Sequence, residues 1–134
     1  MVNSVAKKVH ETKQAPAPIG PYSQAVESNG FVFLSGQIAL DAATGQVSVG
    51  SVAEQARLAM KNIGAVLEVA GLNYDHIIKT TIFLTDMADF PAVNEVYGQY
   101  FKAAPPARST VAVAGLPRGV KVEIEVIAAR PSGH

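Results

Sequence analysis

Six polar residues in this chain of 134 residues have side chains that could do chemistry at one site: Tyr22, Ser35, Asn94, Arg108, Thr110 and Glu123. Arg108 is the most informative, because it follows a pair of prolines and occupies the second position of an apolar strand pattern. Its guanidinium presents a rigid fork of donors that fits a carboxylate. Glu123 could position or activate a water molecule. The set suits a small anionic ligand, although each charged residue alone is more typical of a solvated surface.

The sequence lacks the residues that several other kinds of catalytic or metal site need. The chain has no cysteine, which excludes disulfides, thiolate metal sites and thiol nucleophiles. Its three histidines, His10, His76 and His134, have no ligand spacing, so we expect no metal site. There is no phosphate-binding or dinucleotide-binding glycine motif. Ser35 is not in a nucleophile elbow and no histidine is paired with it by motif, so a hydrolase triad has no support.

The composition restricts the partners. Only 16% of the residues are charged, which is low for a small monomer and suggests that some surface is buried against other subunits. The net charge is zero, so we expect neither nucleic acid nor a membrane as partner. The first eight residues do not resemble a signal peptide and no apolar run reaches membrane-spanning length, so we expect neither feature. We therefore expect one cytoplasmic domain over residues 1–134, with 130–134 as a flexible tail.

Three strands are expected in the first third of the chain. Residues 6–10 form a short candidate strand. Residues 25–28 and 31–37 flank Asn29-Gly30, the dipeptide most typical of a two-residue β-hairpin turn, because both positions tolerate positive φ. The second hairpin strand begins with four apolar residues, which favours a central place in a sheet.

Two helices are expected to cover that sheet. The first spans residues 52–70, where apolar residues recur near the helical period after a capping box formed by Ser51 and Glu54. The second spans residues 90–100, with Asp89 as its expected N-cap. The apolar stripe of each helix is expected to face the sheet, and Asn94 lies off the stripe of the second helix.

The remaining strands are residues 77–84, a strand that begins at Ala107, and residues 120–129. The order is thus β-β-β-α-β-α-β-β, which predicts an α+β fold with a mixed six-stranded sheet and two helices on one face. Along the last strand, Glu123 alternates with apolar residues. Sequence proximity alone would pair the last two strands as a hairpin.

The chain resembles the RidA/YjgF family of enamine and imine deaminases. The matching segments run in order along almost the whole chain: 19–25 (IGPYSQA), 35–37 (SGQ), 44–45 (TG), Asn94 with Tyr97 and Phe101, 106–109 (PARS), 116–117 (LP) and 122–128 (VEIEVIA). Each segment is a weak motif by itself, but the ordered set is specific.

This resemblance implies a chorismate-mutase-like fold and a homotrimer with three clefts between subunits. It also implies that the last strand runs inside the sheet, in place of the hairpin suggested above, and that the Arg108 strand lies near a subunit boundary. Arg108 and Glu123 would then converge on a cleft completed by a neighbouring subunit.

The resemblance further implies hydrolysis of reactive 2-aminoacrylate-type enamines, as their imine tautomers, to 2-oxo acids and ammonia, with no cofactor. Such substrates arise from pyridoxal-phosphate-dependent dehydratases, which gives a functional link to those enzymes. Arg108 would bind the substrate carboxylate bidentately and Glu123 would orient the attacking water. Tyr22 and Ser35 would supply hydroxyls, the Gly36 backbone would contact the ligand, and Asn94 would lie at the rim.

One departure is Thr110, where many members of the family carry a cysteine. A thiol role is impossible there, whereas a hydroxyl in the wall of the substrate pocket remains available. Two rival hypotheses stay open. The protein could be an endoribonuclease or translation inhibitor, a role of some family members, or a non-catalytic trimer that senses a 2-oxo acid or acts like a chaperone. Turnover of an imine would distinguish a deaminase from both rivals.

Overall fold

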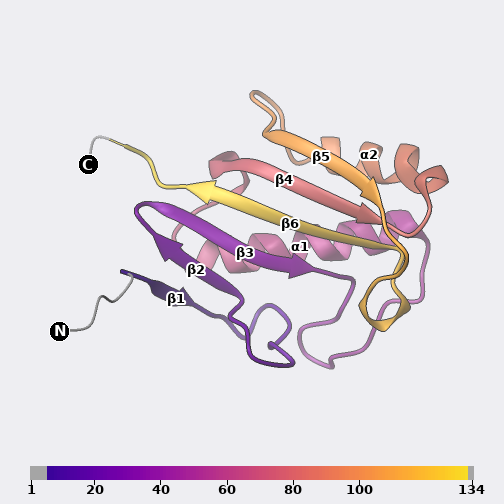
Figure 1. The fold of residues 1–134 in the computed structure, drawn as a ribbon, viewed down its shortest axis with the longest axis horizontal. Helices are drawn as coiled ribbons and strands as arrows, with labels where there is room; N and C mark the ends of the chain where they lie inside the picture. The colour runs from indigo at the N-terminus through magenta and orange to yellow at the C-terminus, as the bar shows by residue number, and fades with distance from the viewer. Residues whose placement is uncertain (1–5, 133–134) are drawn as a thin grey trace.

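Six strands form one sheet in the computed structural model, which describes residues 6–132 (Figure 1). The strands are β1 (Lys8–His10), β2 (Ala25–Ser28), β3 (Phe31–Gln37), β4 (Ile77–Leu84), β5 (Ala107–Ala112) and β6 (Val122–Ala129). Their order across the sheet is β1-β2-β3-β6-β4-β5, and β4 with β5 is the parallel pair. The predicted mixed sheet in an α+β fold is confirmed.

The predicted hairpin between β2 and β3 is present. Asn29 and Gly30 have φ values of 54° and 81°, the left-handed conformation that this turn requires. The first strand is shorter than the range 6–10 expected from sequence, since pairing with β2 begins only at Lys8.

Helix α1 (Val52–Val69) begins as its capping box predicts. The Ser51 hydroxyl accepts from the Glu54 backbone N–H at 3.2 Å, and the Glu54 carboxylate accepts from the Ser51 backbone N–H at 3.2 Å. Helix α2 (Phe90–Gly98) is shorter than expected and ends before residue 100. Asp89 occupies its N-cap position but makes no side-chain cap bond there, so the predicted capping role is wrong. The carboxylate of Asp86 instead caps the preceding 3₁₀ turn.

Strand β6 runs inside the sheet, between β3 and β4, whereas β5 lies at the edge. The chain therefore leaves β5, passes the end of β4 through the short 3₁₀ turn Pro117–Gly119, and returns antiparallel to β4. The hairpin suggested by sequence proximity is absent, and the position of the last strand inside the sheet, which the family resemblance implies, is confirmed. The edge position leaves one side of β5 without a strand partner.

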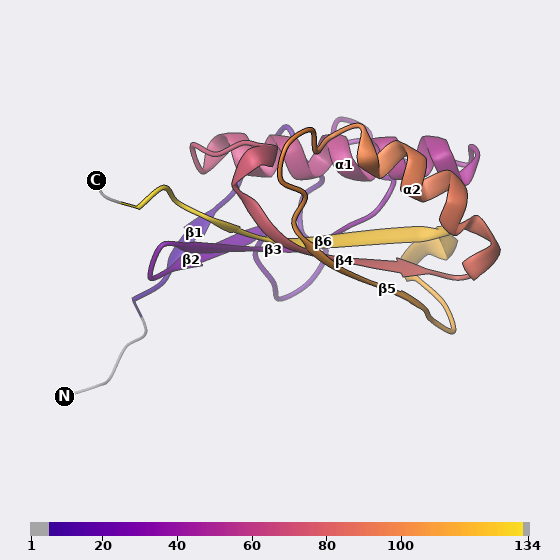
Figure 2. The same cartoon turned by 90° about the horizontal axis from the view of Figure 1, so that it is seen from above.

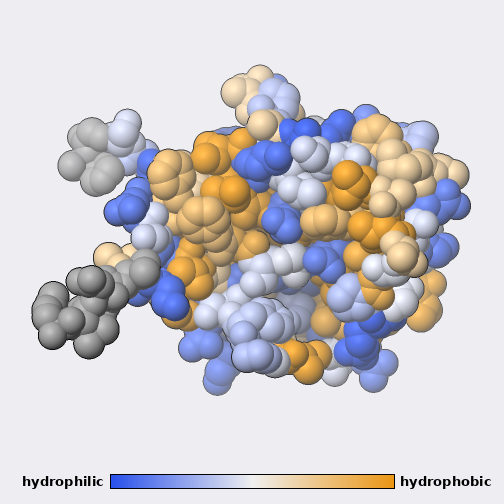
Figure 3. Space-filling view, in the orientation of Figure 1, coloured by the Kyte–Doolittle hydropathy of each residue, from blue (hydrophilic) through white to orange (hydrophobic). Residues whose placement is uncertain are grey.

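Both helices pack on the same face of the sheet, as the view from above shows (Figure 2). The core lies between these layers and includes Ile63, Leu67, Ile82 and Ile124, which are fully buried. No helix of residues 6–132 covers the other face. Figure 3 looks onto it and shows hydrophobic side chains gathered there. The large apolar residues of the strands that remain partly exposed are Val9, Phe31, Phe33, Ile78 and Val111.

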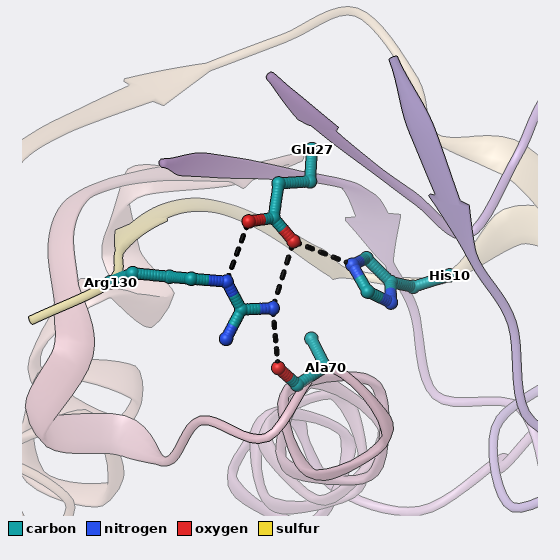
Figure 4. A network of polar contacts seen from close by, with 4 residues as sticks. All are labelled: His10, Glu27, Ala70 and Arg130. Carbon is teal, nitrogen blue, oxygen red and sulfur yellow. Dashed lines mark hydrogen bonds and ion pairs between the residues drawn. The ribbon is translucent and has the colours of Figure 1, made fainter. Parts of the chain in front are cut away.

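A cluster of charges ties the two ends of the described chain together (Figure 4). The Arg130 guanidinium donates to both oxygens of Glu27, at 2.5 and 2.8 Å, and to the Ala70 carbonyl at the end of α1. The His10 ring lies 2.8 Å from the same carboxylate. Arg130 begins the predicted flexible tail but is itself held, and residues 133–134 lie outside the described residues.

Within residues 6–132, no helix combines the length and apolarity needed to cross a membrane.

Candidate active site

A cavity of about 310 Å³ opens where β3 and β6 meet the proline-rich loop before β2. It contains two charged residues, Glu123 and Arg118, together with Tyr22, Gly36 and Gln37. We call these five residues the glutamate half-site. The remaining wall is mostly apolar and is formed by Pro16, Ala17, Ile19, Gln24, Ile38, Leu40 and Pro117. A concave, mainly apolar site with a few convergent polar groups is typical of small-molecule binding.

Gly36 has no side chain and so leaves room for the Glu123 carboxyl group. A β-carbon at residue 36 would lie only 2.8 Å from the carboxyl carbon of Glu123, closer than real side chains approach. The Glu123 side chain is half-buried. Burial, and next the like charge of Glu125, raise the pKa of Glu123 above its ordinary value. A carboxylate with a raised pKa is a better proton acceptor, which suits a group that directs water.

The two candidate hydroxyl residues, Tyr22 and Ser35, differ in whether they line this cavity. Tyr22 lines it, is about half exposed at 52%, and accepts a weak bond of 3.3 Å from the Ile19 backbone N–H. Ser35 is not part of the lining. Its hydroxyl donates to the Ser23 carbonyl at 2.6 Å, and this bond joins β3 to the segment that carries Tyr22. Tyr22 therefore offers its hydroxyl to a ligand more directly than Ser35 does.

Arg108 lies at a second concave surface, beside α2. Its Nη1 donates to the Asn94 Oδ1 at 2.7 Å. The guanidinium also lies 5.2 Å from the Phe90 ring centre and 5.1 Å from that of Tyr97, within range of cation–π attraction. We call Arg108 with Phe90, Asn94 and Tyr97 the arginine half-site. Asn94, which the helical pattern left off the apolar stripe, is thus the residue that orients Arg108.

Thr110 points to the same side of β5 as Arg108, because alternate strand residues share a face. Its Oγ1 is buried and has no hydrogen-bond partner among the residues described. Burial of that oxygen keeps it away from any ligand in this side-chain conformation, so its predicted substrate contact stays a prediction.

Within one chain, Arg108 and Glu123 lie on opposite faces of the sheet. Arg108 pairs with Thr80, which is buried beneath the helices, and contacts α2 itself. Glu123 pairs with Phe83, and the alternation along β6 turns it to the face without helices. The two predicted catalytic residues therefore cannot act on one small molecule inside a single chain.

Sequence reasoning missed Gln37 and Arg118. Gln37 stood in a matched motif, and Arg118 followed another, but neither was recognised as a site residue. The available signals were a polar amide at the end of an apolar strand and a charged residue in a tight loop. In the part of the chain that the structure describes, no group of three His, Asp or Glu residues could hold a metal ion.

The chain is similar in sequence to several known proteins. A family model described as Endoribonuclease L-PSP matches residues 12–130. Protein DfrA of Myxococcus xanthus is 55% identical over 126 residues, covering 92% of this chain and 96% of that protein. The 2-iminobutanoate/2-iminopropanoate deaminase of Mus musculus is 49% identical over 127 residues, covering 95% of this chain and 94% of that protein.

Solved structures with a similar fold come from the same group of proteins. The solved structure of E. coli TdcF with bound serine matches with a TM-score of 0.88 at 48% identity, covering 92% of this chain and 99% of that one. The family model and the relatives extend over nearly all of the residues that carry both half-sites. The chain therefore belongs to the Endoribonuclease L-PSP family, which is the family of the RidA and YjgF proteins.

Proposed function

We propose that this protein deaminates reactive 2-imino acids, the tautomers of 2-aminoacrylate-type enamines, to 2-oxo acids and ammonia. The observation that carries the proposal is that the Arg108 guanidinium has no paired carboxylate among the described residues. The neutral amide of Asn94 orients it instead. A substrate carboxylate is the complement that this fork of donors lacks. Relatives named as 2-iminobutanoate/2-iminopropanoate deaminases support the same substrate class.

Glu123 directs the water in this mechanism. The carboxylate accepts a proton from water as the oxygen adds to the imine carbon, which gives a tetrahedral carbinolamine. That proton passes to the imine nitrogen and completes the neutral carbinolamine. The carbinolamine hydroxyl then gives up its proton to Glu123, which returns it to the amino group, and the C–N bond breaks as the carbonyl forms and ammonia leaves. The imine carbon is already electrophilic, so placing it beside an oriented water supplies much of the rate enhancement. The Tyr22 hydroxyl, which lines the same cavity, orients the reacting groups.

The working unit in this proposal is a homotrimer. Arg108 and Glu123 lie on opposite faces of one sheet, so a shared cleft combines the arginine half-site of one subunit with the glutamate half-site of the next. The partly exposed apolar side chains on the face without helices supply the surface that such an assembly would bury. Three clefts per trimer follow from the symmetry.

The test is a coupled assay in which a pyridoxal-phosphate-dependent dehydratase generates the enamine and 2-oxo acid formation is followed. We expect wild-type protein to accelerate that formation and Arg108→Ala to abolish the acceleration. Arg108→Lys keeps the charge but loses the planar fork, so near-complete loss is expected for bidentate binding. Absence of any acceleration by the wild type would contradict deamination and favour a non-catalytic 2-oxo acid sensor.

A further inference from the structure

Arg108 extends from an exposed edge strand, yet three side chains of α2 contact its guanidinium. Phe90, Asn94 and Tyr97 are four and three residues apart, so they share one face of the helix. Asn94 accepts from one N–H of the guanidinium, and the ring centres of Phe90 and Tyr97 lie 5.2 and 5.1 Å from its carbon. An arginine without such contacts samples many rotamers and loses that freedom when it binds a ligand. This helix face therefore orders Arg108 before any ligand arrives.

Tyr97 is itself held by Thr80. The hydroxyl groups of these two residues share a hydrogen bond of 2.7 Å, and both residues are buried, with exposed fractions of 5% for Tyr97 and 0% for Thr80. Thr80 lies on β4 directly beside Arg108, its register partner on β5. The Phe101 ring packs against the Tyr97 ring, with 4.8 Å between their centres. The Tyr97 ring is therefore fixed by the sheet at its hydroxyl end and by Phe101 along its side.

The protonation state of Tyr97 decides what this residue offers to Arg108. Burial raises the pKa of Tyr97 above its ordinary value, although the bond with Thr80 and the charge of Arg108 oppose the shift. The phenol therefore stays neutral at neutral pH, and its ring attracts the guanidinium through the ring face. A phenolate would instead pair with the N–H groups that a substrate carboxylate needs. The neutral ring thus orients Arg108 without occupying its fork of donors.

We infer that Thr80 and Tyr97 are positioning residues for substrate binding: the hydrogen bond between them fixes the ring against which the Arg108 guanidinium lies, and thereby the direction of its donors. This inference rests on the proposed function, which supplies the carboxylate ligand. Thr80 is fully buried, so it cannot touch a ligand and acts only through Tyr97 and Arg108. Valine and phenylalanine would fill the same space and leave no buried polar group unpaired, so the fold alone does not require the two hydroxyls.

An ordered arginine affects the affinity for the substrate more than the rate of the chemical step. The substrate carboxylate takes no part in the bond changes, so Arg108 holds it equally in the ground state and the transition state. Without the bond between Thr80 and Tyr97, the guanidinium samples more directions, and each binding event must order it again. KM should therefore rise while kcat changes little.

The first experiment measures binding of 2-oxobutanoate by calorimetric titration of the full-length protein, together with imine turnover. In the double variant Thr80→Val/Tyr97→Phe we expect about fivefold weaker binding and a KM raised by the same factor, with kcat near the wild-type value. Thr80→Ser keeps the hydroxyl and should keep wild-type affinity, although loss of the buried methyl lowers its unfolding temperature. Tyr74→Phe is the matched control. The Tyr74 hydroxyl donates to the Met60 carbonyl of α1 at 2.6 Å, so its loss should lower stability without changing affinity.

The second experiment observes Arg108 directly through its Nε–H signal in ¹H–¹⁵N spectra of the ligand-free protein, which Arg108→Lys identifies by its absence. The two rings should shift this signal away from the range of exposed arginines. The signal should move toward that range in Thr80→Val/Tyr97→Phe and stay in place in Thr80→Ser and Tyr74→Phe. An unchanged Arg108 signal or wild-type affinity in the double variant would overturn the inference. If the double variant behaves as expected but the wild type turns over no imine, deamination fails while the positioning role stands.

Discussion

The Glu123 carboxyl group packs directly over the α-carbon of Gly36, in space that a side chain at residue 36 would occupy. The contact joins β3 to β6, which are antiparallel neighbours in the sheet. A side chain at residue 36 would therefore displace the Glu123 carboxyl group. The residue after Ser35 thus controls where the Glu123 carboxyl group can lie.

Gly36→Ala is expected to lower kcat/KM by about 100-fold, because displacing a catalytic group by about 1 Å has effects of that size. The added β-carbon collides with the Glu123 carboxyl and forces it out of place. Kinetics in the dehydratase-coupled assay measure the loss. Gly115→Ala is the control, since a β-carbon there meets nothing within 4 Å and the variant should keep wild-type kinetics. Wild-type activity in Gly36→Ala would remove Glu123 from the mechanism.

The pH profile should report the raised pKa of Glu123. The carboxylate is the active form, so kcat/KM should fall as the pH drops through a pKa that lies above the ordinary glutamate value. Burial is the main cause and the like charge of Glu125 adds to it. Glu125→Gln removes the second cause, so the acidic limb should move to lower pH. A limb that stays in place would show that Glu125 does not influence the titrating group.

Asn94→Ala should raise KM about tenfold with a smaller effect on kcat, because hydrogen bonds to charged groups contribute roughly that factor. Asn94 accepts from Arg108 and fixes the direction of its fork. A double-mutant cycle provides the control: in an Arg108→Ala background, the Asn94 substitution should have no further effect. Additive effects would mean that Asn94 acts independently of Arg108.

Glu27→Gln should destabilise the fold by roughly 2–3 kcal/mol at pH 7. Arg130, with a contribution from His10, lowers the pKa of Glu27 from 4.5 to about 2, although burial opposes the shift. Because the folded pKa is depressed, this stabilisation is present above pH 4.5 and is lost as the pH falls toward 2. Denaturant unfolding at several pH values measures it. Glu68→Gln, an exposed α1 residue, should show no comparable pH-dependent difference.

Local patterns predicted the parts of the fold that local forces decide. Asn29-Gly30 gave the hairpin because a two-residue turn depends on the conformation of those residues alone. Ser51 and Glu54 gave the start of α1 for the same reason. Asp89 failed because Asp86, three residues earlier, caps a 3₁₀ turn that precedes the helix, and a cap residue alone does not distinguish the two starts.

Candidate site residues could be named from the sequence only where residue type and family resemblance coincided. Arg108, Glu123 and Gly36 carry recognisable chemistry at matched positions, and the structure gives each a defined environment. The place of Gln37 in the cavity wall could not be foreseen, because it depends on how the end of β3 meets the proline-rich loop. The separation of Arg108 and Glu123 onto opposite faces likewise depends on strand order, which sequence proximity misjudged.

The central claim is that each catalytic cleft combines Arg108 of one subunit with Glu123 of the next, and subunit mixing tests it most directly. Arg108→Ala and Glu123→Gln proteins, each inactive alone, are unfolded together in equal amounts and reassembled. Random mixing gives hybrid trimers in three cases of four, each with one intact cleft of three, so about a quarter of wild-type activity should return. If the mixture is as inactive as its parents, although hybrids are present by mass, the shared cleft is contradicted.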